Sequence, residues 1–170
     1  MTDRHHDERA PTPSARFSNE GLVAWAFVGV QMLLLALLVL LPSASDWSMP
    51  EWLALASNVG SVAGIALMVV AAVLLRRGLT AVPLPNAHAR LRTGGPYRYV
   101  RHPVYSGLLL FTSALVVSSR SWKVVVVGAS LVVVINVKAR WEERRLLRHF
   151  PDYGDYARRT SRFVPGWPGR

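Results

Sequence analysis

Two long uncharged apolar runs constrain the fold of this chain more than any other feature. Residues 22–41 carry no charged side chain over 20 positions, with Gln31 as the one strongly polar side chain, and residues 52–75 carry none over 24. A helix rises about 1.5 Å per residue, so either run can cross a hydrocarbon core of about 30 Å. A soluble chain of 170 residues could not readily bury both. The sequence therefore predicts an integral membrane protein.

Two shorter apolar runs, residues 104–117 and 124–137, follow on either side of the polar segment 118–123. Each alone is shorter than the usual spanning length of about 20 residues. As a pair joined by a tight polar turn, and extended by flanking residues to 103–119 and 122–138, they predict a transmembrane hairpin. An open sheet edge is not viable in lipid, so the Val-rich sequence does not favour strands. We expect an all-α integral membrane protein with about four transmembrane helices, the first two at 22–41 and 52–75.

The two ends of the chain differ in character. Residues 1–20 are polar and of mixed charge, which predicts a disordered tail before a single membrane domain at 21–170. Residues 139–166 are amphipathic and predict a C-terminal helix at the cytoplasmic interface, broken at Pro151 and Gly154. A secretory signal peptide is the alternative for the first apolar run. That run is longer than a typical signal core of about 7–15 residues and lacks a convincing cleavage site.

Basic residues alternate between the polar segments. Lys plus Arg number three before the first span, none in the first loop, six in the second, two in the third and nine after it. This distribution places both termini and the second loop in the cytoplasm, with the chain in the inner or plasma membrane. The net charge of +10 is explained by membrane lipids rather than nucleic acid, because the basic residues flank the spans. Without cysteine or a His pair at ligand spacing, no metal site is expected.

Residues 95–107 concentrate aromatic and charged groups at the start of the third span. Tyr97, His102 and Tyr105 lie within this short segment. Pro103 disfavours helical dihedrals at the residue before it and suits a first helical turn, so we expect His102 at a helix start. Free backbone N–H groups there can bind an anionic group of a ligand. The alternative is that the aromatic and basic residues only anchor the chain at the membrane interface.

Glu142 and Glu143 are the first carboxylates after Glu51. Adjacent helical residues point about 100° apart, so we expect only one of the two to face inward. That carboxylate could bind ribose hydroxyls or an ammonium group. The alternative is a solvated helix surface with weak pairs such as Glu143 with Arg140. The residues alone leave these two interpretations evenly balanced.

Two separated blocks of the sequence resemble the isoprenylcysteine carboxyl methyltransferase family, membrane enzymes that use S-adenosylmethionine. The wider group includes phospholipid N-methyltransferases. The first block contains Leu91, Gly95, Pro96, Tyr97 and the run Arg101, His102, Pro103, Val104, Tyr105, Ser106 and Gly107. The second contains Arg140, Trp141, Glu142, Glu143, Leu146, Phe150, Tyr153, Tyr156, Arg162 and Pro165.

The resemblance implies an S-adenosylmethionine-dependent enzyme whose lipid or lipophilic small-molecule acceptor enters from the bilayer. By matching position, the cofactor would be bound by Leu91, Tyr97, His102, Pro103, Val104, Tyr105 and Glu143, with backbone near residues 89–92. The catalytic residues would be Arg140, Glu142 and Glu143, and Arg140 would steer the acceptor.

The acceptor class stays open at this point. A carboxylate acceptor needs no base, and no unambiguous base is visible beyond His102, Glu142 and Glu143, which favours carboxyl or O-methylation. The alternatives are N-methylation of a phospholipid or amine, and a non-enzymatic membrane protein such as a transporter subunit or scaffold.

Overall fold

The computed structural model describes residues 13–75 and 91–166, with side chains from Glu20 onward. These residues form helices and no strand element. In chain order the helices are α1 (Pro13–Leu40), α2 (Glu51–Leu75), the short 3-10 helix η2 (Gly95–Arg98), α3 (Pro103–Ser119), α4 (Trp122–His149) and α5 (Tyr153–Arg159). The all-α prediction is confirmed.

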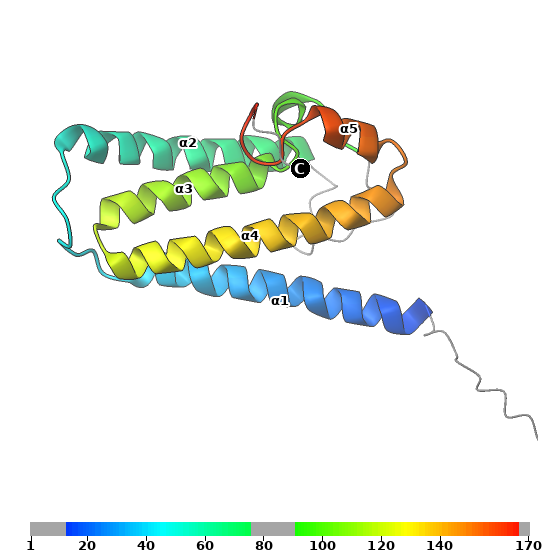
Figure 1. The fold of residues 1–170 in the computed structure, drawn as a ribbon, viewed down its shortest axis with the longest axis horizontal. Helices are drawn as coiled ribbons and strands as arrows, with labels where there is room; N and C mark the ends of the chain where they lie inside the picture. Colours follow the sequence, from blue (N-terminus) through cyan, green and yellow to red (C-terminus); the bar gives the residue numbers. More distant parts are fainter. Residues whose placement is uncertain (1–12, 76–90, 167–170) are drawn as a thin grey trace, which may run out of the picture.

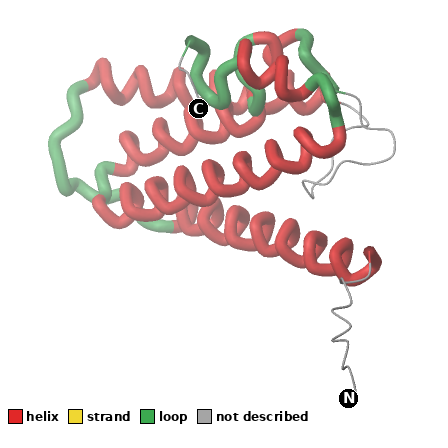
Figure 2. Tube along the Cα trace, turned by 45° about the vertical axis from the view of Figure 1, so that its right-hand side comes forward, coloured by secondary structure: helices red, strands yellow, loops and turns green. Residues whose placement is uncertain are grey.

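The four long helices run side by side along the molecule. Figure 1 shows α2 next to α3 and α4 next to α1, and the turned view in Figure 2 keeps this arrangement. At one end of the bundle, α5 and η2 lie near the point where α3 begins and α4 ends (Figure 1). Three parts of the chain, from Glu20–Leu40, Glu51–Leu75 and Trp122–His149, are long and apolar enough to cross a membrane, and α3 is a shorter apolar helix.

The apolar surface of the helices supports an integral membrane location. Leu33 of α1 and Val62 of α2 are 60% and 68% exposed, respectively, and they are typical of many large apolar side chains on these two helices. Water would not favour so much exposed apolar surface, whereas lipid tails would surround it without cost. The predicted spans at 52–75, 103–119 and 122–138 each fall within one of the long helices, and the span at 22–41 extends one residue beyond the end of α1.

Two boundaries differ from the sequence predictions. Helix α1 begins at Pro13, inside the segment expected to be a disordered tail, because proline suits a first helical turn and no glycine follows before Gly21. Gly154 does not break a helix but lies inside α5, and the chain interrupts its helix only at residues 150–152. The amphipathic segment therefore begins as a direct continuation of the last span within α4.

The close contact between α2 and α3 depends on two glycines. A Cβ atom built at Gly64 would lie 2.7 Å from the carbonyl oxygen of Gly107, and one built at Gly107 would lie 2.6 Å from the carbonyl oxygen of Gly64. Neither distance is tolerated by a real side chain, so glycine at both positions lets the two backbones touch. Small residues serve this purpose where membrane helices pack. This contact fixes the helix that begins beside His102.

The loop between α1 and α2 meets the α3–α4 turn at the other end of the bundle. Asp46 Oδ2 accepts a hydrogen bond of 2.8 Å from the backbone N–H of Trp122, and the Trp47 and Trp122 rings lie 5.2 Å apart. The backbone N–H of Ala44 donates to the carbonyl of Ser119 at 2.8 Å. These two loops were predicted to share one side of the membrane, and they do lie together. Which side they face stays a prediction.

Candidate functional site

His102 lies where the sequence predicted, at the start of α3. It is the N-cap residue, with φ −125° and ψ 64°, and Pro103 occupies the first helical turn. The C-terminal segment runs alongside: the N–H groups of Arg101 and His102 donate to the carbonyls of Ser161 and Arg162 at 2.8 and 3.2 Å. The segment after α5 is thus tied to the loop before α3, and it delivers the Arg162 side chain to the site.

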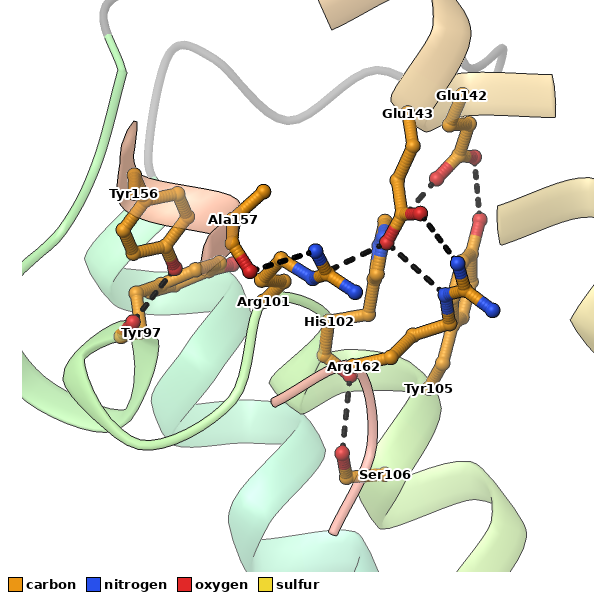
Figure 3. Close-up of polar contacts among 10 residues, drawn as sticks. All are labelled: Tyr97, Arg101, His102, Tyr105, Ser106, Glu142, Glu143, Tyr156, Ala157 and Arg162. Carbon is orange, nitrogen blue, oxygen red and sulfur yellow. Dashed lines mark hydrogen bonds and ion pairs between the residues drawn. The ribbon is translucent and has the colours of Figure 1, made fainter. Parts of the chain in front are cut away.

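Glu143 is the centre of a buried ion network (Figure 3). Its carboxylate accepts two hydrogen bonds from the Arg162 guanidinium, 3.0 Å from Nε and 2.7 Å from Nη2. The Arg101 Nε atom lies 3.2 Å from the same carboxylate, and His102 Nε2 lies 3.2 Å from it as well. Arg101 also donates from Nη1 to the carbonyl of Ala157 at 3.0 Å. Two guanidinium groups therefore share one carboxylate in a site from which water is largely excluded.

Glu142 lies on the other side of the same histidine. The Tyr105 hydroxyl donates to Glu142 Oε1 at 2.5 Å, and Glu142 Oε2 is 3.6 Å from His102 Nδ1. The Tyr105 ring stacks on the imidazole, with centroids 5.4 Å apart. The expectation that only one of the two glutamates faces inward is wrong. Because His102 sits between them, each flexible side chain turns toward one of its ring nitrogens (Figure 3).

Tyr97 is buried but points away from this pair of carboxylates. Its hydroxyl is 3.4 Å from the carbonyl of Ala71 on α2, and its own carbonyl accepts a 2.6 Å hydrogen bond from the Tyr156 hydroxyl. Burial raises the pKa of Tyr97 to about 12 and that of Tyr156 to about 12, so both hydroxyls stay neutral donors. Figure 3 shows the two tyrosines beside Arg101. The Tyr156 hydroxyl therefore joins α5 to η2, while the Tyr97 hydroxyl is directed at α2.

The structure brings together four of the predicted site residues: His102, Tyr105, Glu142 and Glu143. Pro103 and Val104 follow in the first turn of α3, with Pro103 fully buried. Arg140 does not join the cluster, since it is exposed on α4. Leu91 is partly buried ahead of η2 and has no polar role. Of the backbone expected near the cofactor, residues 89 and 90 lie outside the described residues.

Sequence reasoning missed a buried lysine one helical turn before Glu142. Lys138 is only 5% exposed, and its Nζ donates to Gln31 Oε1 of α1 at 2.7 Å. The ammonium also lies over the Tyr105 ring, 5.3 Å from its centroid. Two signals were available in the sequence: a lone lysine ending a Val-rich run, and a lone glutamine in an uncharged span. Arg101 and Arg162 were part of the two motif blocks, but without an assigned role.

The two blocks that converge here fall within a known family. A family model described as phospholipid methyltransferase matches residues 59–153, more than half of the chain. The chain belongs to this family. The match includes His102, Tyr105, Glu142 and Glu143, and ends before Arg162. It confirms the resemblance stated from the two blocks, since phospholipid and isoprenylcysteine methyltransferases form one wider group.

Two curated relatives have names that refer to metal resistance. The cobalt-zinc-cadmium resistance protein CzcN of Cupriavidus metallidurans is 38% identical over 76 residues, which are 44% of this chain and 35% of that protein. The nickel-cobalt-cadmium resistance protein NccN of Alcaligenes xylosoxydans xylosoxydans is 25% identical over 163 residues, which are 92% of this chain and 70% of that protein. The match thus spans about a third of the first relative's length and more than two thirds of the second's.

Proposed function

We propose that this chain transfers a methyl group from S-adenosylmethionine to a lipophilic acceptor at the end of the bundle where α3 begins. One observation carries the proposal. In a member of the phospholipid methyltransferase family, His102 and Glu143 meet at 3.2 Å although they are 41 positions apart in the chain. Buried charged groups at a membrane boundary are costly, and they mark functional sites by default.

The charges of the cluster fit such a cofactor. When bound, S-adenosylmethionine supplies a methyl group already activated on a sulfonium. Its ammonium group and ribose hydroxyls need hydrogen-bond acceptors. A carboxylate offers about four acceptor positions. Those of Glu143 are occupied by Arg162, Arg101 and His102, whereas Glu142 accepts from Tyr105 and faces His102 Nδ1 at 3.6 Å. We therefore assign cofactor binding to Glu142 and positioning of His102 to Glu143.

The remaining predicted residues keep their places in this proposal. Pro103, Val104 and Tyr105 form the first turn of α3, and the backbone N–H groups of Val104 and Tyr105 have no partner within the helix. They would receive the carboxylate of the cofactor. Leu91 and Tyr97 would border it from the segment before α3. Arg140, exposed on α4, would steer an acceptor with a negative charge from outside the cluster.

We propose an oxygen acceptor, with carboxyl methylation favoured. An acceptor carboxylate oxygen forms its bond to the methyl carbon as the carbon–sulfur bond breaks, and no proton has to leave. The residues of the site then have to hold donor and acceptor in line and keep water out. The family description favours a second candidate, methylation of a phospholipid amine. In that reaction His102 or Glu142 would accept the proton that the amine loses.

Label transfer tests the enzymatic proposal against a non-enzymatic membrane protein. Purified protein in detergent is incubated with S-adenosylmethionine carrying an isotopically labelled methyl group and an extract of bacterial membranes. We expect label in the organic phase, on a species that has gained the mass of one methylene. Release of the label by mild base identifies a carboxyl ester, whereas retention indicates an N-methyl product or a methyl ether. Glu142→Gln should transfer no label, whereas the control Glu51→Gln, an exposed residue at the start of α2, should be normal. Absence of label with wild-type protein would remove the proposal.

The names of the two relatives suggest a setting for this activity. Both mention resistance to cobalt and cadmium. We propose that methylation of a membrane component by this chain contributes to tolerance of such metals. A strain carrying Glu142→Gln in place of the wild-type chain should then grow more poorly at raised cobalt or cadmium. Equal growth of the two strains would separate the chain from metal tolerance without touching its proposed chemistry.

A further inference from the structure

The ammonium of Lys138 has unused capacity to bind a ligand. It has three N–H donors, and the partners found for it among the described residues are the Gln31 amide oxygen at 2.7 Å and the face of the Tyr105 ring at 5.3 Å. Both of these partners are neutral, and Lys138 is 5% exposed. The charge of Glu142, one turn further along α4, acts on the ammonium from a distance, while the Glu142 carboxylate accepts from Tyr105. An ammonium buried between membrane helices is costly unless it is paired with opposite charge. Because Lys138 forms no direct ion pair among the described residues, its ammonium can still bind an anionic group of a ligand.

The position of this ammonium is set by α1. Gln31 is the one strongly polar side chain in the uncharged run of α1, and it points at Lys138. Two further contacts hold α1 against α4 in the same register: the Phe27 and Trp141 rings, 5.7 Å apart, and an ion pair between Glu20 and Arg145. Since α1 packs mainly on α4, these contacts decide where Gln31 lies and hence where the Lys138 ammonium points.

The position of Lys138, deeper in the predicted span than the proposed cofactor residues, suits binding of the methyl acceptor rather than of the cofactor. It lies one helical turn before Glu142, toward the interior of the predicted span, while the proposed cofactor residues lie at the end of the bundle. The Tyr105 side chain joins the two places, because its hydroxyl donates to Glu142 and its ring faces Lys138. A group bound at Lys138 would therefore lie beside the proposed cofactor site.

We propose that Lys138 binds the anionic oxygen of a lipophilic carboxylate acceptor and that Gln31 is the positioning residue that holds the ammonium for it. This inference rests on the proposed methyl transfer and adds the residue that binds its acceptor. The acceptor carboxylate takes the N–H donors that Gln31 leaves unused, and its second oxygen is then the attacking atom. An amine acceptor would be repelled by the same ammonium.

Two substitutions of Gln31 separate this role from a purely structural one. Gln31→Glu gives Lys138 a permanent anionic partner that competes with an anionic acceptor. For N-acetyl-S-farnesylcysteine as probe, we expect Gln31→Glu to raise KM at least tenfold and to leave the Kd of S-adenosylmethionine unchanged. Gln31→Leu removes the hydrogen bond but leaves the ammonium available, so we expect a smaller rise in KM. A structural role predicts the reverse order, because a new ion pair between α1 and α4 would stabilise the bundle.

Controls and separate binding measurements keep the outcomes distinct. Asn136→Leu changes a polar side chain of α4 whose hydrogen bond among the described residues is to the carbonyl of Val132 on its own helix, and it should leave KM unchanged. A KM for Gln31→Glu at or below the wild-type value would overturn the proposal. So would wild-type protein that binds S-adenosylmethionine and methylates phosphatidylethanolamine but not the farnesyl probe, and that result would leave the methyltransferase function standing. Failure to bind S-adenosylmethionine at all would instead remove the proposed function, and this inference with it.

Discussion

At the scale of single residues, Glu142 and Glu143 are neighbours with different surroundings. Glu143 is held by two guanidinium groups, whereas Glu142 is held by a tyrosine hydroxyl. A neutral amide can replace a carboxylate as the acceptor of a hydroxyl, but it cannot balance two buried positive charges. The two residues should therefore respond differently to the same substitution.

Replacing each glutamate by glutamine tests this difference. Glu142→Gln should abolish methyl transfer and leave the melting temperature in detergent within a few degrees of wild type. Glu143→Gln should lower both methyl transfer and the melting temperature, because breaking a buried ion pair typically costs about 3–5 kcal/mol. Thermal unfolding and label transfer, measured on the same preparations, check both outcomes. Equal stability of the two variants would show that the network around Glu143 does not hold the site together.

The sequence predicted most residues of this cluster but not which of them form hydrogen bonds and ion pairs with one another. Pro103 after His102 indicated a helix start, and the adjacent glutamates stood out in a region without other carboxylates. The partner of Glu143 could not be read from the sequence, because Arg162 returns to the site only through the backbone pairing of the C-terminal segment with Arg101 and His102. The contact between Gln31 and Lys138 could not be predicted either, because the two residues are 107 positions apart on different spans. Hydropathy does not show which faces of two membrane helices pack together.

At the scale of helices, the α2–α3 contact determines where α3 begins. Sequence periodicity predicted both helices but gave no reason for their close approach, because the apolar positions of membrane helices do not distinguish lipid from protein contacts. The glycine pair Gly64 and Gly107 supplies that reason. Its disruption should be transmitted to His102, which lies at the same helix start as Gly107.

Gly64→Leu should push α3 away from α2. A side chain at this position meets the backbone of Gly107 and Phe111, which cannot move aside as a flexible side chain would. Overpacking typically costs about 1–3 kcal/mol. We expect a lower melting temperature and reduced methyl transfer. Gly29→Ala is the matched control, since no atom lies within 4 Å of a Cβ at this position of α1 and alanine favours a helix. Similar losses in both variants would rule out a specific role for the contact.

At the scale of the whole molecule, the proposed site and the tryptophan-rich loops lie at opposite ends of the bundle. The Trp47–Trp122 contact marks one end, and the His102 cluster marks the other. Helix lengths and the hairpin turn were predictable because an apolar run of a given length has few folded alternatives in a membrane. The side on which each end faces is a separate prediction that rests on the distribution of Lys and Arg.

Reporter fusions test this orientation. Fusions at Ser45 and Arg120 should report an external location, and fusions at Ala87 and Gly169 should report a cytoplasmic one. The reason is that eight Arg residues follow the last predicted span, which Lys138 ends, and six Lys and Arg residues lie in the second loop, against none in the first. An external signal from Ala87 would invert the orientation and separate the proposed site from cytoplasmic S-adenosylmethionine.

The most direct test of the central claim is the affinity of purified protein for S-adenosylmethionine, measured by calorimetry in detergent. His102 contacts both glutamates, so His102→Ala should weaken binding by about 1.5–3 kcal/mol, an increase in Kd of roughly 10- to 150-fold. His149→Ala, an exposed histidine at the end of the same α4 helix that carries both glutamates, should bind as wild type does. Unchanged affinity in a folded His102→Ala variant would contradict the assignment of this cluster as the cofactor site.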